Sequence, residues 1–339
     1  MKSTEIKVLV LGGNGFVGNE IVRQLMQMNH VTPLIGSRTL GDKIVQGVAA
    51  LKIDSTNLLE LKDGLKGVDA VINCVTGDAT TITQGAQLLC HAAALSGMPK
   101  IIHLSSQSVY GTQTGIISEN TPLHDDLGWY GHAKIAAEYA IEDYGRNGGK
   151  AIILRPGCIS GKDSPLWTER IITWLKQGKL GDLGASGDGW SNIVDVADVA
   201  QAATKALNVS LREGEVKIFN LSAPDSPRWN QYFVDLGVSI GATPIKRISN
   251  RAIKLDAYLL GIPIKIIEHI LKKVHIKATW LPHGIPPSLL KLFRQEIKLD
   301  STKATTELEL TWTPYHIMLQ NQTPASPKIP DKIFTLPEL

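Results

Sequence analysis

The sequence "LGGNGFVG" at residues 11–18 decides the fold that this chain is expected to adopt. It overlaps the end of a short apolar run, "IKVLVLG" (6–12), which is typical of a buried strand. It leads into "GNEIVRQLMQMN" (18–29), which is typical of a helix. A glycine-rich turn between a strand and a helix lets the backbone approach a phosphate, and the amino end of the helix offers free N–H groups. The stretch therefore predicts a phosphate-binding loop, with a glycine-rich turn that binds nothing as the alternative.

The spacing of the glycines in this loop indicates which kind of phosphate-containing ligand it binds. Gly12, Gly15 and Gly18 follow the pattern GxxGxxG. The first glycine permits a tight turn, the second lets the backbone approach a pyrophosphate, and the third lets the helix pack on the strand. Because the motif opens with Gly-Gly-Asn-Gly between a strand and a helix, we expect a dinucleotide as the ligand.

Strand-like runs alternate with helix-like stretches along the first half of the chain. Such alternation favours a parallel sheet with right-handed crossovers. Pro33 weakens the second predicted strand, because proline has no N–H to donate. We expect strands at 6–12, 31–37, 48–53, 69–75, 100–106, 150–157 and 216–222, and helices at 18–29, 58–67, 83–97, 130–145, 166–180 and 194–207.

The pattern loosens after Gly161, and the region 223–320 reads as mostly helical. We therefore expect an α/β protein: a Rossmann-type doubly wound parallel sheet with a smaller, mostly helical C-terminal substrate lobe. The segment 256–277 has an apolar stripe and a basic face, which favours a packed helix over a membrane-surface contact. The predicted domains are 1–160 plus 190–222 for the NAD(P)-binding part, 161–189 plus 223–321 for the substrate lobe, and 322–339 for an extended proline-rich tail.

The composition excludes several classes of protein. The net charge of +3 over 339 residues is too small to indicate a nucleic-acid-binding protein. No stretch has the length of uninterrupted apolar sequence that a membrane span needs, and the N-terminus does not resemble a signal peptide. Cys74, Cys90 and Cys158 lie far apart, which argues against a zinc site or a disulfide framework. We expect a cytoplasmic protein without a metal.

The end of the second predicted strand bears on the choice between NAD and NADP. An acidic residue there would bind the ribose 2′-hydroxyl and repel a 2′-phosphate. This chain has Ser37 and Arg38 instead, and a guanidinium pairs well with a phosphate. We therefore expect NADP, with NAD as the alternative and a solvated surface arginine as the non-functional interpretation. Asp54, after the third strand, either contacts the adenine or caps a turn.

A tyrosine and a lysine stand four residues apart in "GWYGHAKIAAE" (128–138), so both lie on one face of the predicted helix. A nearby ammonium stabilises a phenolate, and we expect Lys134 to lower the pKa of Tyr130. The tyrosine would then exchange a proton with a substrate oxygen while a nicotinamide exchanges hydride. Ser106 ends the fifth predicted strand, where its hydroxyl would orient that oxygen, whereas Ser105 points to the other face.

These motifs give the chain a resemblance to the extended short-chain dehydrogenases/reductases, also called the NAD-dependent epimerase/dehydratase family. It is carried by "GGNGFVG" (12–18), "SSQSVYG" (105–111), "YGHAK" (130–134), "RPGCISG" (155–161), "NIVDVADVA" (192–200), "FNLS" (219–222) and "LTWTP" (310–314). The resemblance implies a catalytic triad of Ser106, Tyr130 and Lys134. It also implies a homodimer formed through the helices that contain "TQGAQLLCHAAA" (83–94) and "YGHAKIAAEYA" (130–140).

The expected cofactor site extends beyond the glycine loop. The motifs and the resemblance together imply its further residues. Pro156 and Cys158 would lie against the nicotinamide, and Thr76 near the ribose. The complete expected set is Gly12, Asn14, Gly15, Phe16, Val17, Gly18, Ser37, Arg38, Asp54, Ser55, Val75, Thr76, Tyr130, Lys134, Pro156 and Cys158.

Departures from the family pattern bear on the reaction. The family's dehydratases carry a threonine and an acidic pair before "VYG", whereas this chain has Ser106, Gln107 and Ser108, so water elimination lacks its carboxylates. Ser160 replaces a tyrosine common in the sugar-nucleotide epimerases, and Trp129 replaces a common proline, either lining the substrate pocket or packing.

These observations are compatible with three functions. The first is an NAD(P)-dependent oxidoreductase for a secondary alcohol or ketone. The second is a sugar-nucleotide epimerase with tightly bound NAD. Lys162, Arg170, Lys176 and Lys179 either offer charges toward its diphosphate or form a solvated helix face. The third is a non-catalytic NADP-binding sensor, which a complete triad disfavours. A small-molecule substrate is expected in each enzymatic case.

Overall fold

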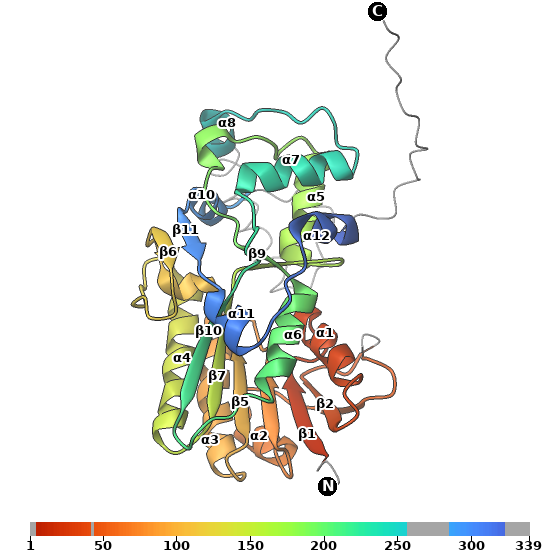
Figure 1. The fold of residues 1–339 in the computed structure, drawn as a ribbon, viewed down its shortest axis with the longest axis vertical. Helices are drawn as coiled ribbons and strands as arrows, with labels where there is room; N and C mark the ends of the chain where they lie inside the picture. Colours follow the sequence, from red (N-terminus) through yellow and green to blue (C-terminus); the bar gives the residue numbers. More distant parts are fainter. Residues whose placement is uncertain (1–4, 42–43, 256–284, 323–339) are drawn as a thin grey trace, which may run out of the picture.

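One seven-stranded parallel sheet forms the lower half of the molecule in Figure 1. The computed structural model describes residues 5–41, 44–255 and 285–322. The strand order is β10-β7-β5-β4-β1-β2-β3, the doubly wound arrangement expected from the sequence, so the predicted fold class is confirmed. The strands are β1 (Ile6–Leu11), β2 (Val31–Ser37), β3 (Ala49–Lys52), β4 (Ala70–Asn73), β5 (Lys100–Leu104), β7 (Ala151–Pro156) and β10 (Val216–Leu221).

Helices cover both faces of this sheet. Along β1, Val8 and Val10 pack with the apolar side chains of α1 and α6, whereas Leu9 and Leu11 pack with those of α2, α3 and α4. Because both faces of the strands are buried, the strand sequences are almost continuously apolar. These helices are α1 (Phe16–Leu25), α2 (Leu58–Gly64), α3 (Ala79–Ala94), α4 (Trp129–Arg146) and α6 (Val196–Ala206).

The expected elements of the sheet domain are present, with shifted ends. α3 begins four residues earlier than predicted, because the Asp78 side chain caps it with a 2.8 Å hydrogen bond from the Thr81 N–H. Pro33 is tolerated in β2 because β3 pairs only with residues from Leu34 onward. The helix expected at 166–180 is shorter: a π-helical turn, η2 (Pro165–Glu169), precedes α5 (Arg170–Lys176).

Two small parallel sheets were not predicted. β6 (Gly115–Ile117) pairs with β11 (Ile297–Leu299), and β8 (Cys158–Ser160) pairs with β9 (Ile193–Asp195). The first pair brings the C-terminal part of the chain beside the short 3₁₀ helix η1 (Gln107–Tyr110). Each strand has three residues, too few for an alternating pattern to stand out in the sequence.

The remaining helices gather at the end of the molecule opposite the N-terminus (Figure 1). Their core is aromatic: Trp229 is fully buried and stacks on Phe233 at 5.5 Å between ring centroids, and Phe293 lies 4.9 Å from the same ring. The predicted domain boundaries stay a prediction, and the segments 256–277 and 323–339 lie outside the described residues. The elements here are α7 (Trp229–Ser239), α8 (Asn250–Leu255), α10 (Pro287–Phe293) and α12 (Tyr315–Gln322), with η3 (Gly184–Ser186) and α11 (Thr302–Glu307) on the connections.

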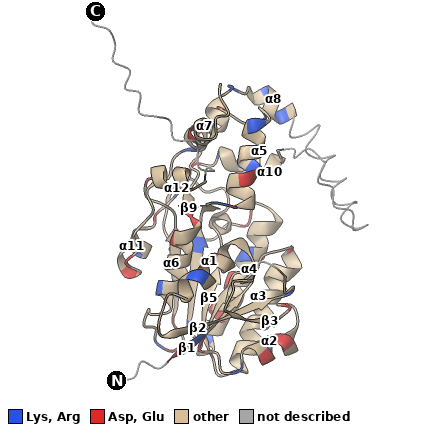
Figure 2. Ribbon diagram, turned by 90° about the vertical axis from the view of Figure 1, so that its right-hand side faces the viewer, with Lys and Arg blue, Asp and Glu red and all other residues tan. Residues whose placement is uncertain are grey.

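Charges of both signs are interspersed along the sheet domain rather than separated onto different parts of it (Figure 2). Within the residues that the structure describes, no helix has both the length and the apolar character that crossing a membrane requires. The absence of a nucleic-acid partner and the cytoplasmic location stay predictions.

Candidate active site and cofactor-binding loop

The glycine loop connects β1 to α1 beside the end of β4, at the point where the strand order reverses. Ligands of doubly wound sheets bind at such a point. Gly12 has φ +76°, and a Cβ there would lie 3.1 Å from the Cys74 backbone carbonyl. A Cβ at Gly18 would lie 2.3 Å from the Gly12 carbonyl oxygen, closer than atoms can approach. The backbone of the loop is therefore packed against itself and against β4, which only glycine permits.

Asn14 connects this loop to the chain that follows β2. Its side-chain amide donates a 2.9 Å hydrogen bond to the Thr39 carbonyl oxygen, and the Ser37 hydroxyl donates to the same oxygen at 3.0 Å. The Asn14 Oδ1 atom is buried and has no hydrogen-bond partner among the described residues. A buried acceptor without a donor, next to a cradle that a Cβ would fill, fits a dinucleotide, whose ribose hydroxyls can donate.

Arg38 is exposed at the end of β2, and its positive charge contributes to lowering the pKa of two carboxyls, Asp54 and Asp78. The pKa of Asp54 is lowered first by hydrogen bonds from Thr56 and to a smaller extent by Arg38. Thr56 donates to the Asp54 Oδ1 atom from its N–H at 2.9 Å and from its hydroxyl at 2.7 Å. Asp54 therefore caps a turn, which was the alternative to an adenine contact. Arg38 follows the last residue of β2, and its contact with a 2′-phosphate stays a prediction.

The other expected cofactor residues surround the same edge. Phe16 and Val17 are half-buried in the first turn of α1, and Ser55 is half-buried after β3. Val75 donates its N–H to the Asn73 side-chain oxygen at 3.1 Å, and Thr76, the next residue, is exposed. Their contact with a cofactor stays a prediction.

The structure brings Ser106, Tyr130 and Lys134 together. Ser106 directly precedes η1, and its Oγ accepts a 3.2 Å hydrogen bond from the Ser108 N–H. The Ser106 side chain lies close enough to the Tyr130 hydroxyl to lower the pKa of Tyr130. Lys134 is buried one turn further along α4, with its Nζ 5.9 Å from the centroid of the Tyr130 ring. The arrangement places two hydroxyls and an ammonium at the carboxyl end of β5.

The protonation states differ from the sequence expectation. Burial raises the pKa of Tyr130, the hydrogen bond with Ser106 lowers it by less, and Cys158 adds to the rise. The expectation that Lys134 gives this tyrosine a lowered pKa is therefore wrong for the protein alone, because desolvation is the largest effect and Lys134 is not among the groups that shift the pKa. Burial also lowers the pKa of Lys134 to about 8, against the opposing effects of Cys74 and Glu138. At neutral pH, Tyr130 holds a proton that it can donate.

Pro156 ends β7 of the same sheet, and Cys158 begins β8 two residues later. Pro156 is buried at the end of β7, and Cys158 is 1% exposed in β8. Burial raises the pKa of the Cys158 thiol, so it stays neutral. The Gln107 amide donates to the Cys158 sulfur at 3.6 Å, and its oxygen accepts from the Asn192 amide at 2.8 Å. Sequence reasoning gave Gln107 no structural role, although its position one residue after Ser106 was a usable signal.

The burial of neighbouring side chains bears on alternatives that the sequence left open. Ser105 is 4% exposed, whereas Ser106 is half-buried, which agrees with their predicted opposite directions. Trp129 is 59% exposed, and its ring stands edge-on to that of Tyr130 at 5.7 Å. It therefore borders the tyrosine at the surface rather than packing in the core.

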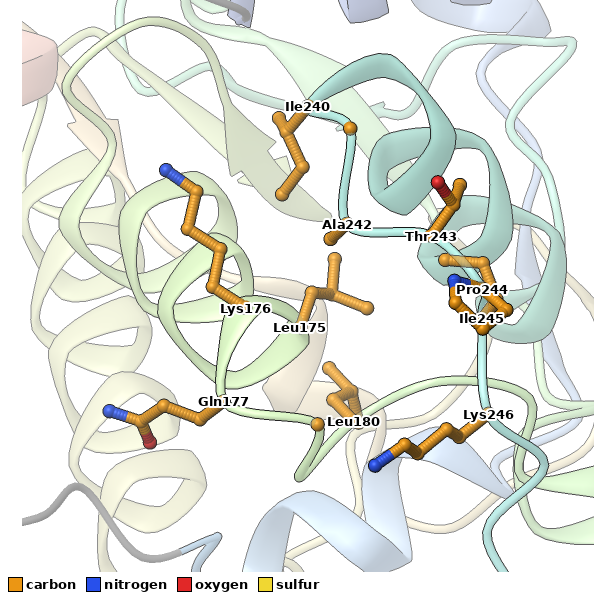
Figure 3. A pocket seen from close by; sticks show the side chains of 12 residues that line it. Leu175, Lys176, Gln177, Leu180, Ile240, Ala242, Thr243, Pro244, Ile245 and Lys246 are labelled. Atoms are coloured by element: carbon orange, nitrogen blue, oxygen red, sulfur yellow. The ribbon is translucent and has the colours of Figure 1, made fainter.

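A pocket of about 420 Å³ lies elsewhere, between the end of α5 and the connection after α7 (Figure 3). Leu175 and Ile245 give it apolar walls, and Lys176 and Lys246 also line it. None of the predicted catalytic or cofactor residues lines this pocket, so it is separate from the site described above. Within the described part of the chain, no three His, Cys, Asp or Glu side chains are grouped so as to hold a metal ion.

Comparison with known proteins places this geometry in a family. Residues 8–222 match the NAD dependent epimerase/dehydratase family, which covers the glycine loop, Ser106, Tyr130 and Lys134. The chain belongs to this family. Its members include dehydrogenases, reductases and nucleotide-sugar epimerases.

Related sequences of this family include two redox enzymes. The chain is 22% identical over 251 residues to a decarboxylating sterol-4-alpha-carboxylate 3-dehydrogenase from Dictyostelium discoideum, covering 67% of this chain and 74% of that protein. It is 26% identical over 212 residues to a 2-alkyl-3-oxoalkanoate reductase from Stenotrophomonas maltophilia, covering 58% of this chain and 63% of that protein.

Solved structures of the family share the fold. A UDP-glucuronic acid 4-epimerase from Bacillus cereus, in complex with UDP-glucuronic acid and NAD, superposes with a TM-score of 0.70 at 19% identity, covering 94% of this chain and 98% of that one. A UDP-glucose 4-epimerase from Thermotoga maritima gives 0.70 at 17% identity, covering 94% and 97%. At such identities, the likeness establishes the fold and leaves the reaction open.

Proposed function

We propose that this protein is an NAD(P)-dependent oxidoreductase that interconverts a secondary alcohol and a ketone, with Tyr130 as the general acid/base. The observation that carries the proposal is the grouping of three side chains beside a loop that fits a dinucleotide: Ser106 is close enough to lower the pKa of Tyr130, and Lys134 lies one helical turn away. Two related sequences named as a dehydrogenase and a reductase support a redox reaction over other family reactions.

The side chains act as follows in the direction of reduction. A bound nicotinamide dinucleotide would supply the hydride to the carbonyl carbon. Tyr130, which is protonated at neutral pH, gives its proton to the carbonyl oxygen, and the Ser106 hydroxyl donates a hydrogen bond to the same oxygen. The Lys134 ammonium stabilises the phenolate that remains. In the direction of oxidation, the proton returns to Tyr130.

Dehydratase chemistry fits this site poorly. Gln107 occupies the position after Ser106 where a carboxylate would be needed, and both ends of its amide are engaged, with Cys158 and with Asn192. Since a neutral, fully bonded amide cannot remove a proton from carbon, we exclude water elimination from the proposal.

The cofactor preference is part of the proposal. We assign NADP, because Arg38 stands exposed at the end of β2, where an acid would otherwise select NAD. NAD is the alternative, and the name of the family favours it.

A nucleotide-sugar epimerase with tightly bound NAD is the second candidate. The observation that favours it is the likeness to 4-epimerase structures over 94% of the chain. In that reaction the cofactor is reduced and reoxidised on one substrate molecule, so no net oxidation of the cofactor accumulates.

The cofactor retained on purification separates these two candidates. We would denature the purified protein, identify any released nucleotide by mass, titrate the empty protein with NADPH and NADH, and then offer a panel of ketones. An empty site that prefers NADPH and oxidises it with a ketone supports the oxidoreductase. NAD retained at full occupancy, with no net turnover, would overturn it in favour of the epimerase.

We also propose a homodimer formed through α3 and α4. Tyr139 on α4 and Leu95 at the end of α3 are 52% and 55% exposed, so both are free to contact a second copy of the chain. Light scattering on the intact chain and on a Tyr139→Glu variant tests this, and a wild-type monomer would refute it.

A further inference from the structure

A buried ion pair joins α4 to β7 behind the candidate catalytic site. Glu138 lies one helical turn beyond Lys134 and is fully buried, and Arg155 is 2% exposed. The Arg155 Nε donates to the Glu138 Oε1 at 3.0 Å, and Nη2 donates to Oε2 at 2.6 Å. These two nearly parallel bonds fix the direction of the guanidinium as well as its position.

The same guanidinium also holds η1. Its Nη1 donates to the Tyr110 hydroxyl at 2.8 Å, and its Cζ atom lies 5.0 Å from the centroid of the Tyr110 ring. The Tyr110 hydroxyl in turn donates to the Asn220 side-chain oxygen on β10 at 2.6 Å. Tyr110 is the last residue of η1, and this helix begins directly after Ser106.

Arg155 therefore connects the two elements that carry the proposed catalytic hydroxyls. Ser106 depends on η1, since it caps that helix, and Tyr130 and Lys134 belong to α4. The two elements also touch closely: a Cβ at Gly131 would lie 2.9 Å from the Ser108 carbonyl oxygen. With so little free space, we expect a change in the bonding of Tyr110 or Glu138 to alter the spacing between η1 and α4.

We propose that Tyr110 and Arg155 are positioning residues, which hold Ser106 and Tyr130 at the separation needed for both hydroxyls to reach one substrate oxygen. The inference rests on the proposed function above. General stability alone does not account for the arrangement, because a buried ion pair is commonly no more stabilising than apolar side chains of the same volume. Its directional bonds instead specify a geometry, and catalysis is sensitive to displacements on the order of 1 Å.

The test compares two tyrosine-to-phenylalanine variants of the whole chain. Tyr110→Phe removes the hydroxyl that Arg155 and Asn220 share. Tyr144→Phe is the matched control: Tyr144 is buried on α4, the helix that carries Tyr130, and its hydroxyl donates to the Pro99 carbonyl oxygen at 2.7 Å, away from η1. We would measure the thermal midpoint, the Kd for NADPH, and kcat and KM for a ketone that the wild type reduces.

We expect Tyr110→Phe to lower kcat by about tenfold, while the Kd for NADPH stays at the wild-type value. We expect Tyr144→Phe to lower the thermal midpoint by as much as Tyr110→Phe does, while its kcat stays at the wild-type value. Equal kcat values for the two variants would overturn the inference. If Tyr110→Phe is insoluble, Asn220→Ser, which removes the acceptor of the Tyr110 hydroxyl, is judged by the same comparison. If the wild type reduces no ketone but interconverts sugar nucleotides, only the proposed function is overturned, because the two variants can then be compared by their kcat of epimerisation. If the wild type is inactive in both assays, both proposals are overturned.

Discussion

Lys134 donates a 2.8 Å hydrogen bond to the carbonyl oxygen of Leu104, the last residue of β5. The bond holds the buried ammonium between the strand that leads to Ser106 and the helix that carries Tyr130. Burial lowers the pKa of this ammonium to about 8, so its charge is present at neutral pH and is lost as the pH rises through that value.

Turnover should therefore fall above pH 8, because a neutral Lys134 no longer stabilises the Tyr130 phenolate. Reduction of a ketone, measured as a function of pH, is expected to show an alkaline limb near pH 8. The Lys134→Met variant should turn over more slowly at every pH and lack this limb. The same limb in that variant would assign it to another group.

Gly18→Ala should weaken both folding and dinucleotide binding. The added Cβ would lie 2.3 Å from the Gly12 carbonyl oxygen and 2.8 Å from the Gly13 Cα, so the backbone of the loop must move. Overpacking of this kind costs about 1–3 kcal/mol, measurable as a lower free energy of unfolding in urea. Gly41→Ala is the control, since its Cβ would meet nothing within 4 Å. Equal Kd values for NADPH in the two variants would contradict the assigned role of the loop.

Arg38→Ala should weaken NADPH binding and leave NADH binding unchanged. A hydrogen bond to a charged group contributes about 1.5–3 kcal/mol, which corresponds to a 10- to 100-fold rise in the Kd for NADPH. Arg23→Ala is a suitable control, because Arg23 is exposed on α1 and pairs with Glu20. Fluorescence titrations of both variants measure this, and a parallel loss of both dinucleotides in Arg38→Ala would refute the 2′-phosphate contact.

Asp198 should make stability fall as the pH rises from 4 to 6. Burial raises its pKa from 3.8 to about 6. Nearby carboxylates add to this rise, and hydrogen bonds from Thr313 oppose it. Between these values the folded state binds more protons than the unfolded state, so the free energy of unfolding decreases with pH, by up to about 3 kcal/mol. Denaturation of Asp198→Asn should show a smaller decrease than the wild type over this range. Parallel curves would place the titration elsewhere.

The sheet and its glycine loop could be predicted because their signals are local. The strand-loop-helix run from Ile6 to Leu25 and the alternation after it depend on neighbouring residues, and the structure has them with ends shifted by a few positions. The pairing of β6 with β11 could not be predicted, because three-residue strands nearly two hundred positions apart leave no pattern in the sequence.

The candidate site was predictable in its membership and less so in its electrostatics. Ser106, Tyr130 and Lys134 were found by spacing and meet in the structure, while their catalytic roles stay a prediction. The raised pKa of Tyr130 was missed, because the degree of burial depends on how α4 packs against η1 and β8. The ion pair between Glu138 and Arg155 was missed for the same reason, although both residues belong to quoted motifs.

The most direct test of the central claim compares hydride transfer by the wild type and Tyr130→Phe. NADPH oxidation by a ketone is followed with equal amounts of each protein, with the Kd for NADPH measured in parallel. We expect kcat to be about 10²- to 10⁴-fold lower in Tyr130→Phe, with an unchanged Kd for NADPH, because only the proton donor is lost. A wild-type kcat in Tyr130→Phe would contradict the role of Tyr130 as the general acid, since another group would then supply the proton.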